Sequence, residues 1–442
     1  LYKFKHLYYT NLQGYFIQIY TLVLYKFAKM VYNIVMAIKR WLEEKIKQSL
    51  KSRRVTILTG ARQCGKTTLA RDIAKPDNFE YVTLDDEEDI AKSDPNGFIK
   101  HDKETMIIDE IQRVPKLITA IKKAVDENTR YGQYLITGSV NIQTLPTVKE
   151  SLAGRVKKIR LRPLTQGEIL KKEPQFLNRL KTQDFVNNNG YDKEKISEII
   201  FMGGFPEPLN YKDKSERAAW YKDYLNTVIE FDLHDISNIK RQDSLKELVA
   251  IIASFSSKFI DKSKITASLS IANQTLDSYL GVLENTYLVD KLMPWLKTDY
   301  ERVNKQSKYF ITDTGLMASL LNWKEDDLIL DADKSGKIFE TFVYNQLISQ
   351  VELDNNEYEL YHYRDREKRE IDFIIQDSNG NIYGIEVKAG SSVTKDQFKH
   401  LKWFGQNLAK GKSFTGIVLY TGEHVIPFGE NMIAIPMNNL WD

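Results

Sequence analysis

Short apolar runs separated by amphipathic stretches dominate the first third of the chain. Five of these runs have the length and composition of buried strands, at 54–60, 79–85, 105–110, 133–139 and 157–163. The stretches between them follow a helical period, and a further helix from Ile38, with Trp41, Ile46 and Leu50 at helical spacing, precedes the first run. Strands that alternate with helices predict an α/β domain over residues 37–165, built on a parallel sheet with both faces covered.

The pattern changes beyond residue 165. Residues 166–235 are more polar and contain the turn sequences NNNG and GGFPEP, which predicts a helical lid and linker. Residues 236–300 have the rhythm of a winged helix-turn-helix, whose second helix carries Leu276, Leu280 and Leu283 on one stripe. The exposed positions of that helix are polar but hardly basic, which favours a packing or partner module over a reader of DNA sequence. Residues 301–442 alternate again and predict a second, small α/β domain.

Residues 1–36 form a separate segment rich in tyrosine, phenylalanine and isoleucine. Their longest uncharged run, at 8–25, has about 18 residues and is marginal for a membrane-spanning helix. We see no small-residue cleavage site of a signal peptide. We interpret the segment as an extension of doubtful role upstream of a start near Met30 or Met36. The rival interpretation is a peripheral membrane helix, and no stable membrane insertion is expected.

The composition bounds the class of protein. The chain has 442 residues, enough for about three domains of ~150 residues each, with 42% apolar and 28% charged residues, as in soluble globular proteins. Its 63 basic and 60 acidic residues leave a net charge of +3, which is too small to indicate a nucleic-acid partner. The single cysteine, Cys64, excludes a disulfide within the chain and fits a cytoplasmic location.

The segment GARQCGKT matches the phosphate-loop pattern G-x-x-x-x-G-K-[ST], directly after a predicted strand and before a predicted helix. Its glycines let the backbone curl around one anion, and the helix adds its positive N-terminal end. Lys66 is expected to neutralise the β- and γ-phosphates of ATP, and Thr67 to place its hydroxyl on Mg²⁺. The predicted nucleotide-binding residues of the loop are Gly60, Ala61, Arg62, Gln63, Cys64, Gly65, Lys66, Thr67 and Thr68. Cys64 lies at a variable position of the pattern, and we interpret it as a bystander.

The third predicted strand ends in two acids, Asp109 and Glu110. Ligands of doubly wound sheets bind at the carboxyl ends of the strands. We expect Asp109 to hold Mg²⁺ through water, and Glu110 to orient and deprotonate the water that attacks ATP. The alternative is a solvated strand end.

Two further polar groups follow the phosphate loop at a distance. Ser139 and Asn141 end the fourth strand and are candidate sensors of the γ-phosphate, with ordinary turn chemistry as the alternative. Arg155 precedes the fifth strand and is a candidate arginine finger, which a neighbouring subunit can supply. The alternative for Arg155 is a surface arginine in a basic run.

The order of these motifs resembles the AAA-type ATPases of bacteria and archaea that carry a C-terminal domain of unknown function of the DUF4143 type. The resemblance rests on the phosphate loop, then IIDEIQRVPKL, LITGS, SLAGRV with LRPLT, GGFPEP and KYFITDTGLMASLL, and it covers residues 38–403. It implies a P-loop ATPase core of the AAA+ kind. It also implies homo-oligomers with ATP at the subunit boundaries.

Near the end of the chain, EIDFIIQ and NIYGIEVK flank the turn sequence DSNG and predict a β-hairpin. Period-two alternation places Ile371 and Phe373 on one face and Asp372 on the other. The second strand likewise turns Glu386 and Lys388 away from its apolar positions. Two carboxylates that converge there would bind a divalent metal, and the lysine would position or activate a water molecule.

The hairpin resembles the core of the PD-(D/E)xK nucleases, over residues 334–408. The resemblance implies catalytic roles for Asp372, Glu386 and Lys388, with both acids as metal ligands. It implies an additional metal ligand in Glu340, which lies on the helix upstream. The alternatives are a solvated hairpin of alternating charge and a nuclease fold retained without cleavage.

The sequence therefore supports two main hypotheses of function. The first is a Mg²⁺-dependent ATPase coupled to a DNA-directed, nuclease-like C-terminal domain, with DNA as a candidate partner. The alternative is a nucleotide-switched signalling or binding module whose end domain does not cleave. A third option is a membrane-peripheral ATPase directed by the N-terminal helix.

Overall fold

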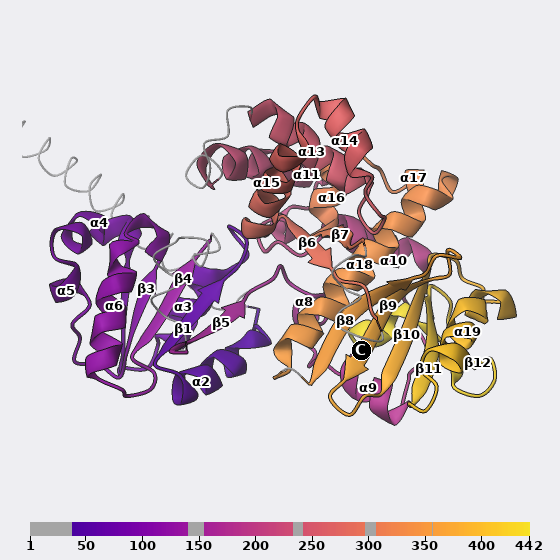
Figure 1. Cartoon of the computed structure of the whole chain (residues 1–442), viewed down its shortest axis with the longest axis horizontal. Helices are drawn as coiled ribbons and strands as arrows, with labels where there is room; N and C mark the ends of the chain where they lie inside the picture. Colours follow the sequence, from indigo (N-terminus) through magenta and orange to yellow (C-terminus); the bar gives the residue numbers. More distant parts are fainter. Residues whose placement is uncertain (1–37, 140–153, 233–241, 297–305, 356) are drawn as a thin grey trace, which may run out of the picture. The chain divides into compact units, whose positions relative to one another are not determined.

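The structure of the protein, a computed structural model, describes residues 38–139, 154–232, 242–296, 306–355 and 357–442 (Figure 1). Contacts between residues divide the chain into two units, Leu1–Lys39 and Arg40–Asp442. Of the first unit only residues 38 and 39 are described, so the account below concerns the second unit. The predicted N-terminal extension at 1–36, with its rival interpretation as a peripheral membrane helix, and the candidate sensor Asn141 lie outside the described residues.

Five short strands form a parallel sheet in the first part of the second unit. They are β1 (Val55–Thr59), β2 (Phe79–Thr83), β3 (Thr105–Asp109), β4 (Tyr134–Gly138) and β5 (Val156–Arg160). Their order is β2-β3-β4-β1-β5, and every pair of neighbours is parallel. The five predicted strands are confirmed, although the residues of β2, at the edge of the sheet, are only partly buried. Because β4 lies between β3 and β1, the carboxyl ends of these three strands are neighbours at one edge.

Helices cover both faces of this sheet, as the sequence predicts. They are α2 (Leu42–Ser52), α3 (Lys66–Ile73), α4 (Leu84–Ser93), α5 (Pro95–Phe98), the 3-10 turn η1 (Ile111–Arg113) and α6 (Lys116–Glu127). Successive residues of a strand point to opposite faces. Ile107 of β3 accordingly packs in one apolar cluster with Leu69 of α3, whereas Ile108 packs in another with Leu117 and Ile121 of α6.

The middle of the chain is mainly helical. Its first elements are α8 (Gln166–Ile169), α9 (Phe176–Thr182), α10 (Lys193–Met202), η3 (Pro208–Asn210), α11 (Lys214–Thr227) and the π-helical turn η4 (Val228–Asp232). The next are α13 (Gln242–Ser254), α14 (Lys262–Leu269), α15 (Asn273–Asn285), β6 (Val289–Leu292), β7 (Lys308–Ile311), α16 (Thr314–Leu320) and α17 (Asp327–Leu330). β6 and β7 pair antiparallel, and the leucine stripe of α15 is buried as expected. The helices α10 and α11, predicted as part of a lid, pack against α16.

The last part of the chain is a second α/β layer structure. Its elements are α18 (Ala332–Leu353), β8 (Tyr358–Arg364), β9 (Glu370–Asp377), β10 (Ile382–Lys388), η6 (Lys395–Phe398), α19 (Lys399–Asn407), β11 (Phe414–Tyr420), β12 (Ile426–Pro427), β13 (Met432–Pro436) and η7 (Met437–Leu440). The sheet order is β12-β13-β11-β10-β9-β8, with β10, β11 and β13 parallel and β8 and β9 antiparallel to their neighbours. The predicted hairpin is confirmed as β9 and β10.

The alternation predicted for β9 is wrong at its start. Phe373 packs in the cluster that contains Phe339 of α18, whereas Ile371 packs in the opposite cluster with Ile374. The reason is a register shift between β8 and β9, because one residue of β8 faces two residues of β9, Asp372 and Phe373. Such a bulge re-aims the side chain that it carries, and here that side chain is the predicted catalytic Asp372.

Within the described ranges, no helix combines the length and the apolar character needed to cross a membrane.

Candidate functional site

The phosphate loop joins β1 to α3 through residues with positive φ. The φ angles are 151° at Gly60, 60° at Gln63 and 100° at Gly65, which caps the N-terminus of α3. A side chain at Gly60 would place its Cβ 2.2 Å from the carbonyl oxygen of Leu161, so only glycine fits there. This backbone conformation lets successive N–H groups face one anion at the start of a helix.

Lys66 is the first residue of α3 and is almost fully buried. Its ammonium donates hydrogen bonds to the carbonyl oxygens of Gly60 (3.1 Å) and Ala61 (2.9 Å). Among the residues that the structure describes, no carboxylate forms an ion pair with it. The positive charge is therefore held by neutral dipoles of the loop itself, within reach of any phosphate that the loop binds.

Asp109 ends β3 and is held in one orientation. Its Oδ2 accepts a hydrogen bond from the Tyr81 hydroxyl at 2.8 Å, and its Oδ1 accepts one from Thr137 of β4. Burial, with the hydrogen bond to Asp109, raises the pKa of Tyr81 to about 12, so the tyrosine remains a donor. The carboxylate is 1% exposed and its oxygens are fixed at the carboxyl edge of the sheet.

Glu110 follows in the left-handed conformation, with a φ of 59°. A glutamate in this region is strained, and such strain is concentrated at functional sites. Its backbone N–H donates to the Thr137 hydroxyl at 3.2 Å, and its side-chain carboxylate accepts a hydrogen bond from Gln112. The same Gln112 amide donates to the hydroxyl of Ser139 at 3.2 Å. Gln112, which we did not single out from the sequence, thus links the predicted base to the predicted sensor.

Arg155 lies at the opposite edge of the sheet. It precedes β5, and its carbonyl oxygen accepts a hydrogen bond from the N–H of Val55, the first residue of β1. At ~3.3 Å per residue, the length of β1 separates that edge from the phosphate loop by roughly 15 Å. Its guanidinium pairs with Asp126 of α6. Arg155 is therefore placed away from the phosphate loop of its own chain.

Arg40 contacts the phosphate loop directly and was missed in the sequence. Its guanidinium donates to the carbonyl oxygens of Cys64 (2.9 Å) and Arg162 (2.6 Å), and its Nε pairs with Glu168 at 3.0 Å. Cys64 itself is buried, with its Sγ 3.5 Å from the carbonyl oxygen of Leu161, in agreement with a packing role. The sequence around Arg40 does not indicate this role, because the partners of its guanidinium lie far away in the chain.

The residues of this edge fit a nucleotide with Mg²⁺. Carboxylate and hydroxyl oxygens are the ligands that Mg²⁺ prefers. Asp109 supplies a fixed, buried carboxylate, and Thr67, partly exposed in the first turn of α3, supplies a hydroxyl. Lys66 supplies a buried cation with neutral partners. Together these residues supply the oxygen ligands that Mg²⁺ needs and the positive charge that a polyphosphate needs.

A second group of charged residues lies in the C-terminal part. We define the acidic centre as the carboxylates of Glu340 on α18, Glu370 and Asp372 on β9, and Glu386 on β10. The Nζ of Lys308 lies 2.8 Å from Glu340, 2.7 Å from Glu370 and 3.9 Å from Asp372. The predicted metal ligands Glu340 and Asp372 are thus near one another, with the ammonium of Lys308 between them.

The predicted hairpin residues also contact one another. The Nζ of Lys388 is 3.3 Å from Glu386, and Asp372 accepts a hydrogen bond from the N–H of Val387 at 2.9 Å. Burial and the charge of Asp372 raise the pKa of Glu386 well above its usual value. Burial would lower the pKa of Lys388, but the charges of Glu386 and Asp372 outweigh it and raise that pKa.

Lys308 is fully buried and was not expected in this place. Burial alone would lower its pKa, but the charges of Glu340, Asp372 and Glu370 outweigh burial and raise the pKa above the usual value. Over the described ranges of the chain, no group of three or more His, Cys, Asp or Glu side chains is arranged to hold a metal ion. The carboxylates predicted as metal ligands therefore do not fit a metal as they stand, because an ammonium ion lies between them.

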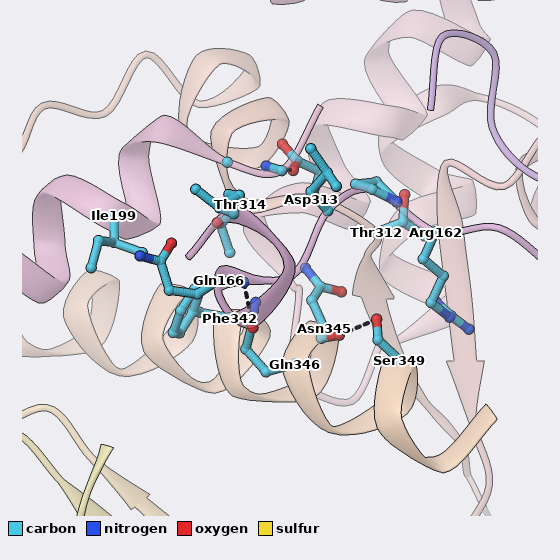
Figure 2. Close-up of a pocket in the computed structure, with 15 residues that line it drawn as sticks. Arg162, Gln166, Ile199, Thr312, Asp313, Thr314, Phe342, Asn345, Gln346 and Ser349 are labelled. Atoms are coloured by element: carbon cyan, nitrogen blue, oxygen red, sulfur yellow. Dashed lines mark hydrogen bonds between the residues drawn. The ribbon is translucent and has the colours of Figure 1, made fainter. Parts of the chain in front are cut away.

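Figure 2 shows a pocket lined by the segment after β5, the segment before α16 and the helix α18. The backbone N–H of Gln166 donates to the side chain of Gln346 at 2.9 Å. The buried Oδ1 of Asn345 has no hydrogen-bond partner within the described part of the chain. The cavity has a volume of about 20 Å³. A single water molecule needs ~10–15 Å³ by the same measure, so the pocket is not a nucleotide site.

Three family models match successive parts of the chain. Residues 52–170 match the AAA domain family AAA_14, residues 193–327 match a domain of unknown function, DUF8612, and residues 335–440 match another, DUF4143. The first match covers the whole parallel sheet with the phosphate loop. The third covers most of α18 and the sheet of the acidic centre, whereas Lys308 belongs to the second match.

Relatives are similar to this chain over most of their length. The uncharacterized protein Rv2008c of Mycobacterium tuberculosis is 27% identical over 400 residues, which cover 90% of this chain and 83% of the relative. The uncharacterized protein MJ1544 of Methanocaldococcus jannaschii is 25% identical over 410 residues, which cover 84% of this chain and 86% of the relative.

Solved structures resemble the chain more weakly. The Walker-type ATPase PabY2304 of Pyrococcus abyssi is 14% identical with a TM-score of 0.42, and covers 64% of this chain and 96% of its own. AMPPCP-bound DnaA from Aquifex aeolicus is 14% identical with a TM-score of 0.28, and covers 55% of this chain and 86% of its own. These scores do not establish a common overall arrangement.

The family matches agree with the geometry of the site. The protein carries a P-loop ATPase domain of the AAA type, with a phosphate loop formed by residues 60–67. More particularly, it joins this domain to a C-terminal DUF4143 domain.

Proposed function

We propose that the protein binds ATP with Mg²⁺ at the carboxyl edge of β1, β3 and β4 and hydrolyses it. The observation that carries this proposal is the convergence of four side chains at that edge, Lys66, Asp109, Glu110 and Ser139. Lys66 exchanges its hydrogen bonds to carbonyl oxygens for the β- and γ-phosphates. Since those carbonyl groups are neutral, the exchange breaks no ion pair.

Thr67 and Asp109 would hold the metal ion, which neutralises phosphate charge when bound. Glu110 accepts the proton of the attacking water, and Gln112 fixes its carboxylate relative to Ser139. The hydrogen bonds from Tyr81 and Thr137 keep Asp109 oriented. Each residue therefore has a distinct task at one edge of the sheet.

We extend the proposal to homo-oligomers in which Arg155 acts on the nucleotide of a neighbouring subunit. Its position at the opposite edge of the sheet and its pairing with Asp126 support an intersubunit role over one within the subunit. Arg155→Ala should then lower turnover without lowering ATP affinity, and the loss should be reversed in mixtures with subunits that carry Glu110→Gln but retain Arg155.

The central test replaces the base. Glu110→Gln removes the proton acceptor but keeps the hydrogen-bonding shape, so ATP binding should persist while turnover falls by about 10²–10⁴-fold. Steady-state phosphate release and a nucleotide titration measure the two quantities separately. The matched control is Glu127→Gln on α6, an exposed glutamate of the same domain, which should leave both unchanged. Turnover in Glu110→Gln equal to that of the wild type would reject the proposal.

A second proposal concerns the C-terminal domain, which we infer to be DNA-directed and non-cleaving in this conformation. The segment from η6 through α19 and the turn beyond it carries exposed or partly exposed lysines and one acid, Asp396; the lysines are Lys395, Lys399, Lys402, Lys410 and Lys412. Such a surface suits a polyanionic backbone. The resemblance to PD-(D/E)xK nucleases supports DNA as the polyanion, and Lys308 in the acidic centre supports binding without cleavage.

DNA binding and cleavage are tested separately. Lys399→Glu with Lys402→Glu should weaken DNA binding for all sequences and reduce the salt dependence by about one unit per lysine. Lys123→Glu, an exposed lysine of α6, is the matched control and should change little. Wild-type protein with Mg²⁺ or Mn²⁺ should leave DNA intact. Cleavage that Asp372→Asn abolishes would instead establish the nuclease function.

A further inference from the structure

The acidic centre is neutralised by cations of the chain itself. Each of its four carboxylates has a basic partner within 4 Å, and these partners are Lys258, Lys308, Arg364 and Lys388. Lys258 lies 3.5 Å from Glu340, and Arg364 lies 3.8 Å from Glu370. The number of positive groups equals the number of carboxylates, so no carboxylate of the centre is left without a basic partner.

Lys308 differs from the other three cations in its burial and in its origin. It is 0% exposed, whereas Lys258 is 42% exposed and Lys388 is 35% exposed. It belongs to β7, in the segment that matches DUF8612, whereas the carboxylates belong to the segment that matches DUF4143. The central cation of the C-terminal domain is thus supplied by the domain that precedes it.

The backbone fixes Lys308 in this place. Within β7, the backbone of Lys308 pairs with Leu292 of β6 and also forms a β-bridge with Phe259. Its ammonium lies 5.6 Å from the centre of the Phe259 ring, which adds a cation–π contact. A change of side-chain rotamer cannot bring a fully buried ammonium to water without breaking these ion pairs. The lysine therefore leaves the acidic centre only if β7 moves.

We propose that Lys308 is a built-in counter-cation that excludes divalent metal from the acidic centre while β7 is docked on the C-terminal domain. A divalent metal needs several carboxylate oxygens at about 2.0–2.6 Å, and the oxygens of Glu340 and Glu370 already bind the ammonium. The acidic centre is therefore closed to metal in the arrangement that the structure shows. This inference does not rest on ATP hydrolysis.

The experiment measures Mn²⁺ binding to the full, nucleotide-free chain by the loss of the free-ion resonance signal. The test variant combines Lys308→Met with Glu370→Gln, which removes one positive and one negative charge and keeps Glu340, Asp372 and Glu386. It should bind Mn²⁺ at least about tenfold more tightly than the wild type does. Adding Asp372→Asn to this variant should abolish the gain. Mn²⁺ should raise the thermal midpoint of the variant but not that of the wild type.

The matched control is Lys258→Met, the same substitution at the exposed edge of the centre, which should not gain Mn²⁺ affinity because Lys308 remains. A wild-type chain that binds Mn²⁺ through Asp372 as tightly as the variant would overturn the proposal. So would a folded variant without a gain that depends on Asp372, because a merely structural lysine leaves no metal site behind. ATP titration of the same samples separates this outcome from failure of the ATPase proposal, since Lys308 does not contact the phosphate loop.

Discussion

Lys66 in the phosphate loop and Lys308 in the acidic centre are both buried, yet their partners differ. Lys66 donates to two backbone carbonyl oxygens, whereas Lys308 is surrounded by three carboxylates. An ammonium held by neutral dipoles can transfer to an incoming anion, whereas one held by carboxylates would leave uncompensated buried charges behind. The charge of the partners, rather than burial, therefore separates the lysine that we propose binds phosphate from the lysine that we propose excludes metal.

The largest expected effect comes from the same substitution at both positions. Lys308→Met should lower the free energy of unfolding by about 3–5 kcal/mol, because it leaves buried carboxylates without their cation. Lys66→Met should change it by less than about 1 kcal/mol, because only hydrogen bonds to carbonyl oxygens are lost. Urea unfolding of the full chain without nucleotide measures both values. Equal losses at the two positions would contradict the comparison.

Nucleotide binding should show the reverse order. Lys66→Met removes the cation that the phosphates use, so the affinity for ATP with Mg²⁺ should fall about 100-fold, or ~3 kcal/mol. Lys308→Met should keep the wild-type affinity when it is measured at a temperature where the variant is folded. Isothermal titration gives both values. A wild-type affinity in Lys66→Met would show that the loop backbone alone binds the phosphates.

Asp290 provides the mirror image, a buried carboxylate between two guanidinium groups. Arg160 lies 2.6 Å from it, and Arg162 pairs with its other oxygen. Burial alone would raise the pKa of Asp290, but the two arginines outweigh burial and lower it from 3.8 to about 2. Because the folded pKa is lower than the unfolded one, the stabilisation is complete above pH ~4 and is lost as the pH falls towards 2.

The corresponding prediction concerns Asp290→Asn. The variant should be less stable than the wild type at pH 5 by about 2 kcal/mol, and the difference should shrink towards zero near pH 2. Unfolding midpoints measured across this pH range test the prediction. A difference that does not depend on pH would mean that the carboxylate contributes by shape rather than by charge.

The smallest effect is expected at an exposed lysine. Lys47 on α2 is 43% exposed and lies 2.6 Å from Glu43. Its ion pair is screened by water and salt, so Lys47→Met should change the free energy of unfolding by less than about 0.5 kcal/mol. This variant sets the lower limit against which Lys308→Met is compared. A loss above about 1 kcal/mol would show that burial contributes less to the contrast than we infer.

The predicted residues of the phosphate-loop site come from parts of the sequence that are recognisable by themselves. The loop is contiguous, and Asp109 and Ser139 follow apolar strands whose carboxyl ends meet at one edge of a parallel sheet. The same reasoning places β9 and β10 as a hairpin. Strand periodicity and turn chemistry are local properties of the sequence, so they can be recognised without knowledge of distant contacts.

Other features depend on contacts that local patterns do not contain. Arg40 and Lys308 are polar residues beside apolar ones, and their partners lie more than twenty residues away in the chain. The bulge at Asp372 depends on the pairing of β9 with β8, and the alternation of β9 alone conceals it. The sequence contains one indication of the role of Lys308. This lysine is followed directly by the apolar residues of β7, and a lysine buried in such a strand needs a partner of opposite charge.

The contacts of Arg40 set a practical limit on where the ATPase domain can be cut for expression. A fragment that begins at residue 52, the start of the AAA match, lacks the guanidinium that binds the carbonyl oxygen of Cys64. A fragment that stops before Glu168 lacks the carboxylate that pairs with Arg40. A truncated ATPase that is inactive is therefore informative only if it spans both residues.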